Sequence, residues 1–307
     1  MNRRTFLQTA SAAALATGRA GAVAPSSRIV DTHTHFYDPT REVGVPWPGK
    51  GSPLYRPVYP KDWKAVAAPL GVGETVVVEA SQRVEDNQWI LDLAAKDKSI
   101  VGFIGNLDPT DAAFSQNLKR FAANPLFKGI RWRGDLVKVD SADAGVKRCA
   151  KELAEHGLVL ELNGRAAMLK DAARLAREIP DLRIMIDHVG GAGDPSQLSD
   201  EWKLGMKEAG ALKNVFCKVS ALQEQTGEST KKWGSAPRDV DYYLPILDHC
   251  VQCFGDERLV YGSNWPVAEK GGSYADQFKL VSDYFGGKGR EIAERYFWKN
   301  AKAVYRF

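Results

Sequence analysis

The first strand-like stretch of the chain is apolar at its start and runs directly into two histidines: Ile29-Val30-Asp31-Thr32-His33-Thr34-His35-Phe36. Alternate side chains of an extended strand share one face, so His33 and His35 are expected to point the same way, about 7 Å apart. Two imidazoles at that spacing can converge on one metal ion or one substrate oxygen. The alternative is that both sit on a solvated edge strand, because His-x-His is a short motif.

The composition is that of a globular protein with a sizeable core. The chain has 307 residues and 44% hydrophobic content, which fits one large α/β barrel or two ordinary domains. No internal apolar run approaches the length of a membrane-spanning helix. The formal net charge is +4, and residues 1–22 hold three arginines and no acidic residue, so their removal leaves about +1. This charge gives no electrostatic case for binding nucleic acid.

The first 22 residues have the parts of an export leader in order. Paired arginines at positions 3 and 4, followed by Phe and Leu, resemble a twin-arginine signal, and an alanine-rich apolar run comes next. Ala20-Gly21-Ala22 offers a small-residue cleavage site. A frayed amphipathic helix is the disfavoured alternative, because the apolar run has no helical stripe. We expect cleavage after Ala22, a mature domain of residues 23–307, and a periplasmic or secreted bacterial protein.

Strand-like and helix-like segments alternate along the rest of the chain. The strand-like runs are at 29–35, 75–79, 100–107, 127–131, 158–162, 183–188, 215–219 and 259–261. The helix-like segments are at 60–70, 85–95, 111–123, 142–156, 165–178, 198–211, 240–254 and 275–285, followed by an amphipathic helix at 290–305. Eight such units in about 280 residues predict a single α/β domain, a (β/α)8 TIM barrel with an extra C-terminal helix over one end. A doubly wound open sheet, the alternative, would place a glycine-rich turn after the first strand, where His-Phe-Tyr-Asp-Pro stands instead.

Polar side chains recur at the predicted strand ends, which is where such barrels carry their active residues. They include His33, His35, Glu79, Arg131, Glu161, His188 and Asn264. Arg131 could bind a substrate carboxylate through two hydrogen bonds, or could pair with an acidic neighbour. Glu161 could be a catalytic carboxylate, or a buried partner of an arginine such as Arg131.

The longest irregular segment, residues 36–59, contains aromatic side chains and five prolines. A long loop in a compact domain is usually functional, so this one is expected to form a rim over the site. Trp47 and Tyr55 from this loop, and Trp265 near the last strand, could stack on a sugar ring. Each could equally be ordinary packing, because aromatic side chains bury large areas.

Six short motifs along the mature chain carry a family resemblance. They are Asp-x-His-x-His at 31–35, Leu54-Tyr55-Arg56-Pro57, Lys128-Gly129-Ile130-Arg131, Ile186-Asp187-His188, Gly262-Ser263-Asn264-Trp265-Pro266-Val267 and Asn300-Ala301. In this order they resemble the amidohydrolase superfamily, and more narrowly its amidohydrolase-related branch of sugar-lactone and dicarboxylate-lactone hydrolases. The resemblance covers the whole mature chain.

The resemblance implies a hydrolase that opens a sugar lactone or a similar small carboxylated lactone, with one divalent metal ion, zinc or manganese, or with none. His33 and His35 match the strand 1 pair, which would polarise the carbonyl directly or as metal ligands, and His188 matches the strand 6 histidine. Asn264 stands where these lactonases place an aspartate as general base. Because an amide cannot accept a proton at neutral pH, Glu79 and Glu161 are the candidates to replace that base.

The other candidate residues are expected to bind substrate: Arg131, Glu79, Trp47, Tyr55 and Trp265. Two further classes of function stay open. A barrel without catalysis would bind a sugar acid or lactone, which Asn264 favours and the intact histidine set disfavours. A non-hydrolytic decarboxylase acting on aromatic acids would use a similar metal site, although it too would want a carboxylate at position 264. The expected partner is in each case a small molecule, and a homo-oligomer is possible.

Overall fold

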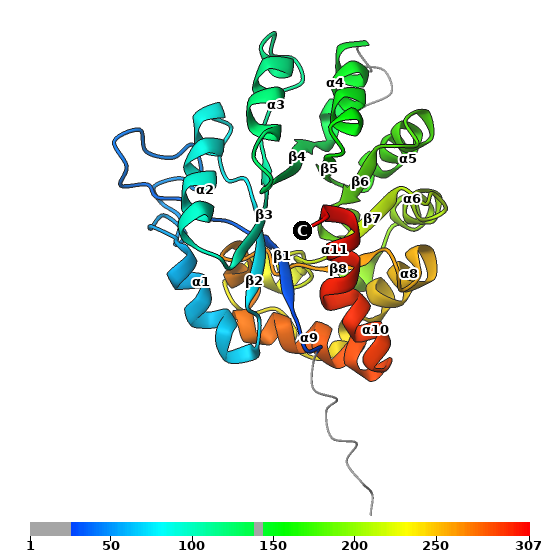
Figure 1. Ribbon diagram of the computed structural model, residues 1–307. Coiled ribbons are helices and arrows are strands. Elements are labelled where there is room, and N and C mark those ends of the chain that lie inside the picture. The colour runs from blue at the N-terminus through cyan, green and yellow to red at the C-terminus, as the bar shows by residue number, and fades with distance from the viewer. Residues whose placement is uncertain (1–25, 138–143) are drawn as a thin grey trace, which may run out of the picture.

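The computed structural model describes residues 26–137 and 144–307, and within them eight parallel strands form a barrel surrounded by helices (Figure 1). The strands are β1 (Val30–Thr34), β2 (Glu74–Val78), β3 (Ile100–Gly105), β4 (Phe127–Arg133), β5 (Val159–Asn163), β6 (Arg183–Ile186), β7 (Val215–Val219) and β8 (Leu259–Tyr261). Each strand pairs with the next one along the chain. The predicted (β/α)8 barrel is therefore confirmed. The predicted leader lies outside the described residues.

Helices surround the barrel, and the last of them lies over one of its ends. They are α1 (Pro60–Ala67), α2 (Val84–Lys96), α3 (Phe114–Ala122), α4 (Ala144–Glu155), α5 (Met168–Glu178), α6 (Asp200–Gly210), α7 (Gly227–Lys231), α8 (Leu244–Phe254), α9 (Tyr274–Gly287), α10 (Arg290–Glu294) and α11 (Asn300–Tyr305). The third helix begins at Phe114, three residues later than predicted, because the Asp111 carboxylate accepts a hydrogen bond from the Ala113 amide (2.8 Å) and holds a turn there. The short helix α7 has no counterpart in the sequence prediction, and residues 142–143 of the fourth predicted helix lie outside the described part.

β8 closes the barrel against β1 through bonds beyond the regular strand ladder. The Thr32 hydroxyl donates to the Tyr261 carbonyl (2.6 Å), and the Asn264 amide N–H donates to the His33 carbonyl (2.8 Å). The His35 amide N–H donates in turn to the carbonyl of residue 265 (2.9 Å). The residues that follow β8 are thereby held beside the two histidines of the first strand.

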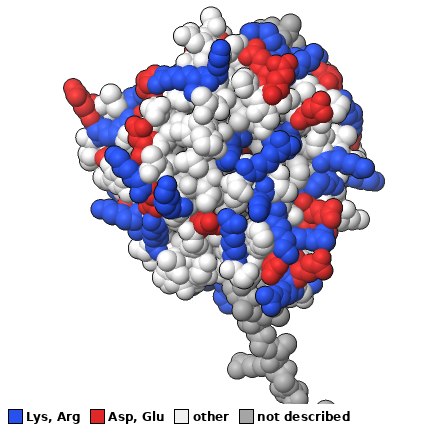
Figure 2. Space-filling view, in the orientation of Figure 1, with Lys and Arg blue, Asp and Glu red and all other residues white. Residues whose placement is uncertain are grey.

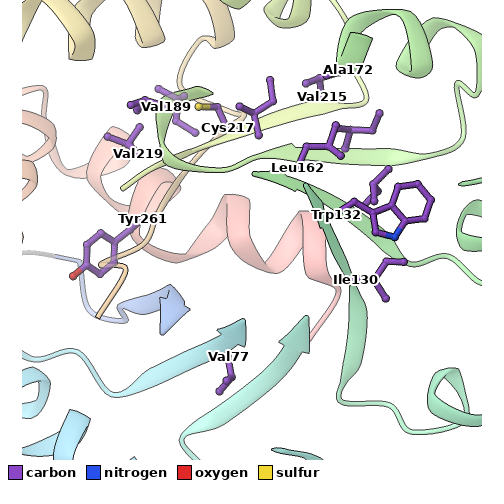
Figure 3. Close-up of a cluster of buried hydrophobic side chains, with 14 of the residues drawn as sticks. Val77, Ile130, Trp132, Leu162, Ala172, Val189, Val215, Cys217, Val219 and Tyr261 are labelled. Atoms are coloured by element: carbon purple, nitrogen blue, oxygen red, sulfur yellow. The ribbon is translucent and has the colours of Figure 1, made fainter. Parts of the chain in front are cut away.

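Two apolar cores bury both faces of the strands. The outer core lies between strands and helices and includes Val77, Ile130 and Leu162 (Figure 3). The inner core fills the barrel itself, where Val76 and Val260 are among the buried residues. Burial on both faces explains why the strands are near-continuous apolar runs in the sequence.

The C-terminal segment covers one end of the barrel, as predicted, and the structure shows that this is the amino-terminal end. It consists of α10, a π-helical turn at Arg295–Lys299 and α11, which lies across the barrel in Figure 1. Lys128 Nζ donates to the carbonyl of residue 306 (3.1 Å), and the Arg183 guanidinium donates to the carbonyl of Val304. Because Lys128 and Arg183 stand at the starts of β4 and β6, these bonds fix α11 over that end.

Basic and acidic side chains are interspersed over much of the face in Figure 2. Some charged side chains of the surface are paired; Arg295, for example, donates to Glu257 (2.8 Å) and to Glu291 (3.0 Å). Exposed pairs of this kind contribute little to stability, so the two apolar cores carry most of it. In the described part of the chain, no helix combines the length and apolarity that crossing a membrane requires.

Candidate active site

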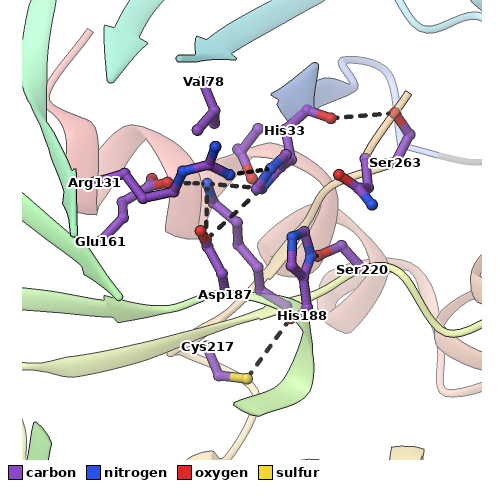
Figure 4. A network of polar contacts seen from close by, with 12 residues as sticks. His33, Val78, Arg131, Glu161, Asp187, His188, Cys217, Ser220 and Ser263 are labelled. Atoms are coloured by element: carbon purple, nitrogen blue, oxygen red, sulfur yellow. Dashed lines mark hydrogen bonds and ion pairs between the residues drawn. The ribbon is translucent and has the colours of Figure 1, made fainter. Parts of the chain in front are cut away.

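Three histidines meet at the carboxyl end of the barrel, and Figure 4 labels two of them, His33 and His188. His33 lies in β1, His35 follows it, and His188 comes two residues after β6. The ring centroids of His33 and His35 are 5.0 Å apart, and those of His33 and His188 are 4.4 Å apart. Gly262 permits the chain after β8 to lie close against His33, because a Cβ atom there would lie 2.9 Å from the Cβ atom of His33. The histidines that the sequence placed at strand ends 1 and 6 thus form one cluster.

An irregularity in β1 turns both histidines inward. Strict alternation would place Val30 and His33 on opposite faces of the strand. However, Val30 belongs to the inner core, and His33 contacts Lys218 inside the barrel. The register between β1 and β2 shifts between Asp31 and Thr34, which accounts for the departure from alternation.

A buried ion network lies beneath the histidines. The Lys218 ammonium group on β7 contacts Glu161 Oε2 at 2.6 Å, Asp187 Oδ1 at 3.3 Å and His33 Nδ1 at 3.4 Å. All four side chains are fully buried. The Tyr305 hydroxyl of α11 donates to Glu161 Oε1 at 2.6 Å. Glu161 is therefore held by a strand on one side and by the C-terminal helix on the other.

Arg131 points into the barrel from β4 and is paired with Glu79. Its Nε and Nη2 atoms donate to Glu79 Oε1 (2.9 and 2.7 Å), and Nη2 also donates to the Glu79 carbonyl (2.8 Å). Its Nη1 atom lies 3.4 Å from His33 Nε2. The buried partner of Glu161 is thus Lys218, and the charge of Arg131 is compensated by Glu79.

Burial keeps the three imidazoles neutral. It lowers the pKa of His35 to about 3, and nearby Arg131 adds to that shift. Burial is also the main cause that lowers the pKa of His188 to about 4. The pKa of His33 lies well below its ordinary range because of burial and, next, the positive charge of Lys218. A neutral imidazole offers one nitrogen lone pair, so the cluster can accept protons or bind a metal ion.

The backbone is strained where the chain leaves three neighbouring strands. His188 (φ 54°) and Val189 (φ 48°) follow β6, Ala221 (φ 53°) follows β7, and Asn264 (φ 61°) follows β8. Left-handed conformations at residues other than glycine cost of order 1–3 kcal/mol each and persist where the surroundings hold them, commonly at functional sites. Ser220 helps to restrain His188 in this conformation, because its Oγ atom lies within hydrogen-bond distance of His188 Nδ1 (2.9 Å).

A cavity of about 610 Å³ opens above the histidines. Six of the residues that the sequence singled out line it: His35, Trp47, Glu79, Arg131, His188 and Asn264. Trp47 belongs to loop 36–59, and its ring lies 6.1 Å from that of His35, so the loop does contribute to the rim of this cavity. Gln82, Asn106 and Asn163 add neutral amide groups to the wall of the cavity.

Four other candidates lie outside this lining. His33 and Glu161 are fully buried and belong to the network beneath the cavity. Trp265 is buried in the outer core, and Tyr55 is half-buried in its loop.

Hydrogen bonds fix the tautomer of His35. Its Nδ1 atom faces the carbonyl oxygens of Val78 (3.0 Å) and Glu79 (3.1 Å), which can only accept, so this nitrogen carries the proton. Its Nε2 atom is then an acceptor and lies 3.3 Å from Asn264 Oδ1. The lone pairs of His35 Nε2 and Asn264 Oδ1 therefore face each other at the edge of the cavity.

Comparisons with known proteins place the chain in a family. A family model described as Amidohydrolase matches residues 30–307. The chain belongs to the amidohydrolase family. An L-fucono-1,5-lactonase of Burkholderia ambifaria is 30% identical over 250 residues, which cover 80% of this amidohydrolase and 83% of that protein. An L-fucono-1,5-lactonase of Burkholderia multivorans is 24% identical and covers 82% of this chain and 86% of its own.

Among solved structures, an amidohydrolase from Burkholderia multivorans with bound zinc is similar to this amidohydrolase, with a TM-score of 0.81 and 21% identity. The match covers 91% of this chain and 99% of that one. At this level of identity the likeness supports the barrel fold.

One group in the described part of this amidohydrolase could hold a metal ion. One ligand atom each from His33, Asp187 and His188 lies within 4.8 Å of the others. Asp187 Oδ1 is already in an ion pair with Lys218 (3.3 Å), while Oδ2 is buried and makes no hydrogen bond within the described residues, which fits a carboxylate that can bind a cation. Two imidazoles and a carboxylate are a donor set that suits a divalent ion such as zinc. The sequence prediction paired His33 with His35 as ligands, whereas this group contains Asp187 and His188 with His33.

Sequence reasoning gave no role to three residues of the site. Asp187 belongs to the motif Ile186-Asp187-His188, and its position at the end of an apolar strand could have indicated a site residue. Lys218 was detectable as a lone charge inside the apolar run 215–219. Glu224, whose Oε1 atom accepts a hydrogen bond from Asn264 Nδ2 (3.0 Å), lies in an irregular segment without any periodic signal.

Proposed function

We propose that this amidohydrolase opens a sugar lactone by hydrolysis. The observation that carries the proposal is the cavity at the barrel mouth, where His35 and His188 stand beside neutral amides. Gln82, Asn106 and Asn163 each offer donors and acceptors, which suits the hydroxyl groups of a sugar ring. The two relatives named L-fucono-1,5-lactonase support the same class of substrate.

A neutral sugar lactone fits this cavity better than a lactone that carries carboxylates. Arg131 lines the cavity, but two of its hydrogen bonds already go to the Glu79 carboxylate. An arginine that is paired in this way attracts a substrate carboxylate less than an uncompensated one. Trp47 on the rim offers an aromatic face on which a sugar ring can lie.

In the proposed reaction a water oxygen bonds to the carbonyl carbon, the ring C–O bond breaks, and the ring oxygen becomes a hydroxyl group. His35 Nε2 takes one proton from the water and passes it to the ring oxygen. The low pKa of His35 makes it a weak base, which favours giving the proton back within the reaction. Arg131 Nη1, which makes none of the bonds to Glu79 and lies close to His33, can donate a hydrogen bond to the carbonyl oxygen as that oxygen becomes negative. The second water proton leaves with the new carboxylic acid, which ionises in solvent.

His33, Asp187 and His188 are the residues that would hold a divalent ion, zinc or manganese, in this proposal. When bound there, the ion would polarise the lactone carbonyl. Ser220 orients His188 through its Nδ1 atom and leaves Nε2 directed away from that bond. The zinc in the solved relative from Burkholderia multivorans supports a metal of this kind.

We also propose that the protein acts in the periplasm or outside the cell. The support is the leader-like sequence of residues 1–22, with its paired arginines and the small-residue site that ends at Ala22.

The test of the proposed reaction is a pH-indicator screen of sugar lactones with the purified protein, with and without added zinc or manganese. We expect turnover of at least one sugar lactone, and a drop in kcat of about 10²-fold or more for His35→Ala. The matched control is His156→Ala, because His156 is exposed and follows α4. Tight binding of a lactone without turnover, or release of carbon dioxide from an aromatic acid instead, would overturn the proposal.

A further inference from the structure

Glu224 is a buried acid next to the site that the proposed reaction leaves without a role. It lies between β7 and α7, and its Oε1 atom accepts a hydrogen bond from Asn264 Nδ2 at 3.0 Å. Its Oε2 atom is buried and has no hydrogen-bond partner in the described part of the chain. A buried carboxylate oxygen without a hydrogen bond lowers the stability of the fold, so the presence of Glu224 at this position calls for an explanation.

The Asn264 side chain is the link between Glu224 and the cavity. The backbone of Asn264 is fixed on both sides, because its N–H donates to the His33 carbonyl (2.8 Å) and its carbonyl accepts from the Ala268 N–H (2.9 Å). What stays adjustable is which way the side-chain amide faces. Because an ionised carboxylate can only accept, Glu224 holds Nδ2 toward itself and directs Oδ1 toward His35 Nε2 at 3.3 Å.

The resulting arrangement presents two acceptors and no donor. His35 Nδ1 already carries its proton toward two carbonyl oxygens, so Nε2 has only a lone pair to offer, as has Asn264 Oδ1. Two acceptors this close repel unless a donor bonds to both. A water molecule has two O–H donors and fits between such groups at the edge of a cavity.

We propose that Glu224 is a positioning residue for the lactone hydrolysis proposed above: its carboxylate orients the Asn264 amide so that Asn264 Oδ1 and His35 Nε2 together hold the attacking water. Glu224 itself lies outside the cavity lining and acts through Asn264. This inference rests on the proposed function, and it assigns Asn264 the task of holding the water by a hydrogen bond.

Protonation of Glu224 should undo this arrangement. Burial raises the pKa of Glu224 to about 7, while the Asn264 hydrogen bond and the charge of Lys270 in the turn Val267–Lys270 favour the ionised form. The phenol of Tyr243, in the turn Val240–Tyr243, is also close and stays neutral, because burial raises its pKa. A protonated Glu224 can donate, so the Asn264 amide can turn over, accept from Glu224 through Oδ1 and donate to His35 through Nδ2. The water would then lose both acceptors, so activity should fall as pH drops through about 7.

The experiment measures kcat and KM for a hydrolysed sugar lactone between pH 5 and pH 9, with the full-length protein, Glu224→Gln and Glu228→Gln. Glutamine keeps the size of glutamate but does not ionise. Because its amide can both donate and accept, it does not hold the Asn264 amide in one orientation. We expect Glu224→Gln to lower kcat about tenfold at pH 8, to leave KM within about threefold, and to remove the fall in kcat near pH 7. Glu228→Gln should behave as the wild type, because Glu228 is exposed and pairs with Lys231.

A second pair of variants separates orientation of the amide from a general loss of structure. If Glu224 acts only through Asn264, then Glu224→Gln should lower kcat no further once Asn264→Ala is present. An unchanged fall in kcat near pH 7 in Glu224→Gln, or an equal loss of kcat with and without Asn264→Ala, overturns the inference alone. A wild-type protein that hydrolyses no sugar lactone overturns the proposed function and this inference with it.

Discussion

Replacing Lys218 with methionine should destabilise the barrel strongly, because one buried ammonium group serves two buried carboxylates. It lies 2.6 Å from Glu161 Oε2 and 3.3 Å from Asp187 Oδ1, and no side chain of the three is exposed to solvent. Removing one partner of a buried ion pair costs about 3–5 kcal/mol, and methionine fills a similar volume, so little of the loss comes from a cavity. We expect the upper part of that range, which corresponds to a fall in Tm of roughly 7–8 °C, because about 280 folded residues give an unfolding entropy of roughly 0.6 kcal/mol/K.

The loss should depend on pH in a defined direction. Burial raises the pKa of Glu161 above its ordinary value, and Lys218 opposes that rise. Without Lys218 the folded-state pKa of Glu161 rises further, while the unfolded-state value stays the same. Between these two pKa values the folded variant binds a proton that the unfolded chain does not, so the variant regains stability as pH falls through that window. The difference from the wild type should be large at pH 8 and smaller at pH 5.

Urea unfolding followed by circular dichroism at both pH values measures the effect. Lys279→Met is the control, because Lys279 is exposed and pairs with Asp283, and its free energy of unfolding should change by less than about 1 kcal/mol. Adding Glu161→Gln to Lys218→Met should restore part of the stability, since the amide needs no cation and can still accept from Tyr305. Wild-type stability of Lys218→Met at pH 8, or a larger loss at pH 5, would refute the reasoning.

Two further predictions rest on the structure, and a third rests on the sequence of residues 1–22 alone. Tyr305→Phe should lower the free energy of unfolding by about 1–3 kcal/mol in the urea assay, because Glu161 loses a buried donor; a shift below about 0.5 kcal/mol would contradict this. Metal analysis of the purified protein should find about one zinc or manganese ion per chain, and His188→Ala should lose it; equal retention by the variant would exclude His188 as a ligand. Arg3→Lys combined with Arg4→Lys should trap the precursor inside the cell, and undiminished periplasmic accumulation of that variant would argue against the leader.

The local part of the fold was accessible from sequence because barrel strands are buried on both faces. The run 259–261 is apolar throughout and the run 215–219 is apolar apart from Lys218, and the structure has strands at both positions. The places of His33, His35 and His188 at the carboxyl ends of strands then followed from the geometry of parallel barrels. Those inferences need only two facts: side chains alternate along a strand, and all strands of such a barrel run in the same direction.

The contacts that organise the site were not accessible in the same way. Glu161 meets Lys218 and Tyr305 across 57 and 144 positions of the sequence, and no local period records such a meeting. Glu224 lies in an irregular segment, where neither helical nor strand spacing applies. The identity of the partner of Glu161 was therefore open between an arginine and other cations, and only the three-dimensional arrangement assigns it to Lys218.

The position of α11 has a consequence for synthesis on the ribosome. Val304 and Tyr305 fill the floor of the inner core, more than 270 positions after β1, and Tyr305 is one of the groups that hold Glu161 in place. While residues 300–306 are still inside the exit tunnel, the eight strands can be outside it, yet the floor of the barrel stays open and Glu161 lacks its phenol donor. The network beneath the histidines can therefore reach its final arrangement only after this segment has emerged, which couples the last stage of folding to the assembly of the site.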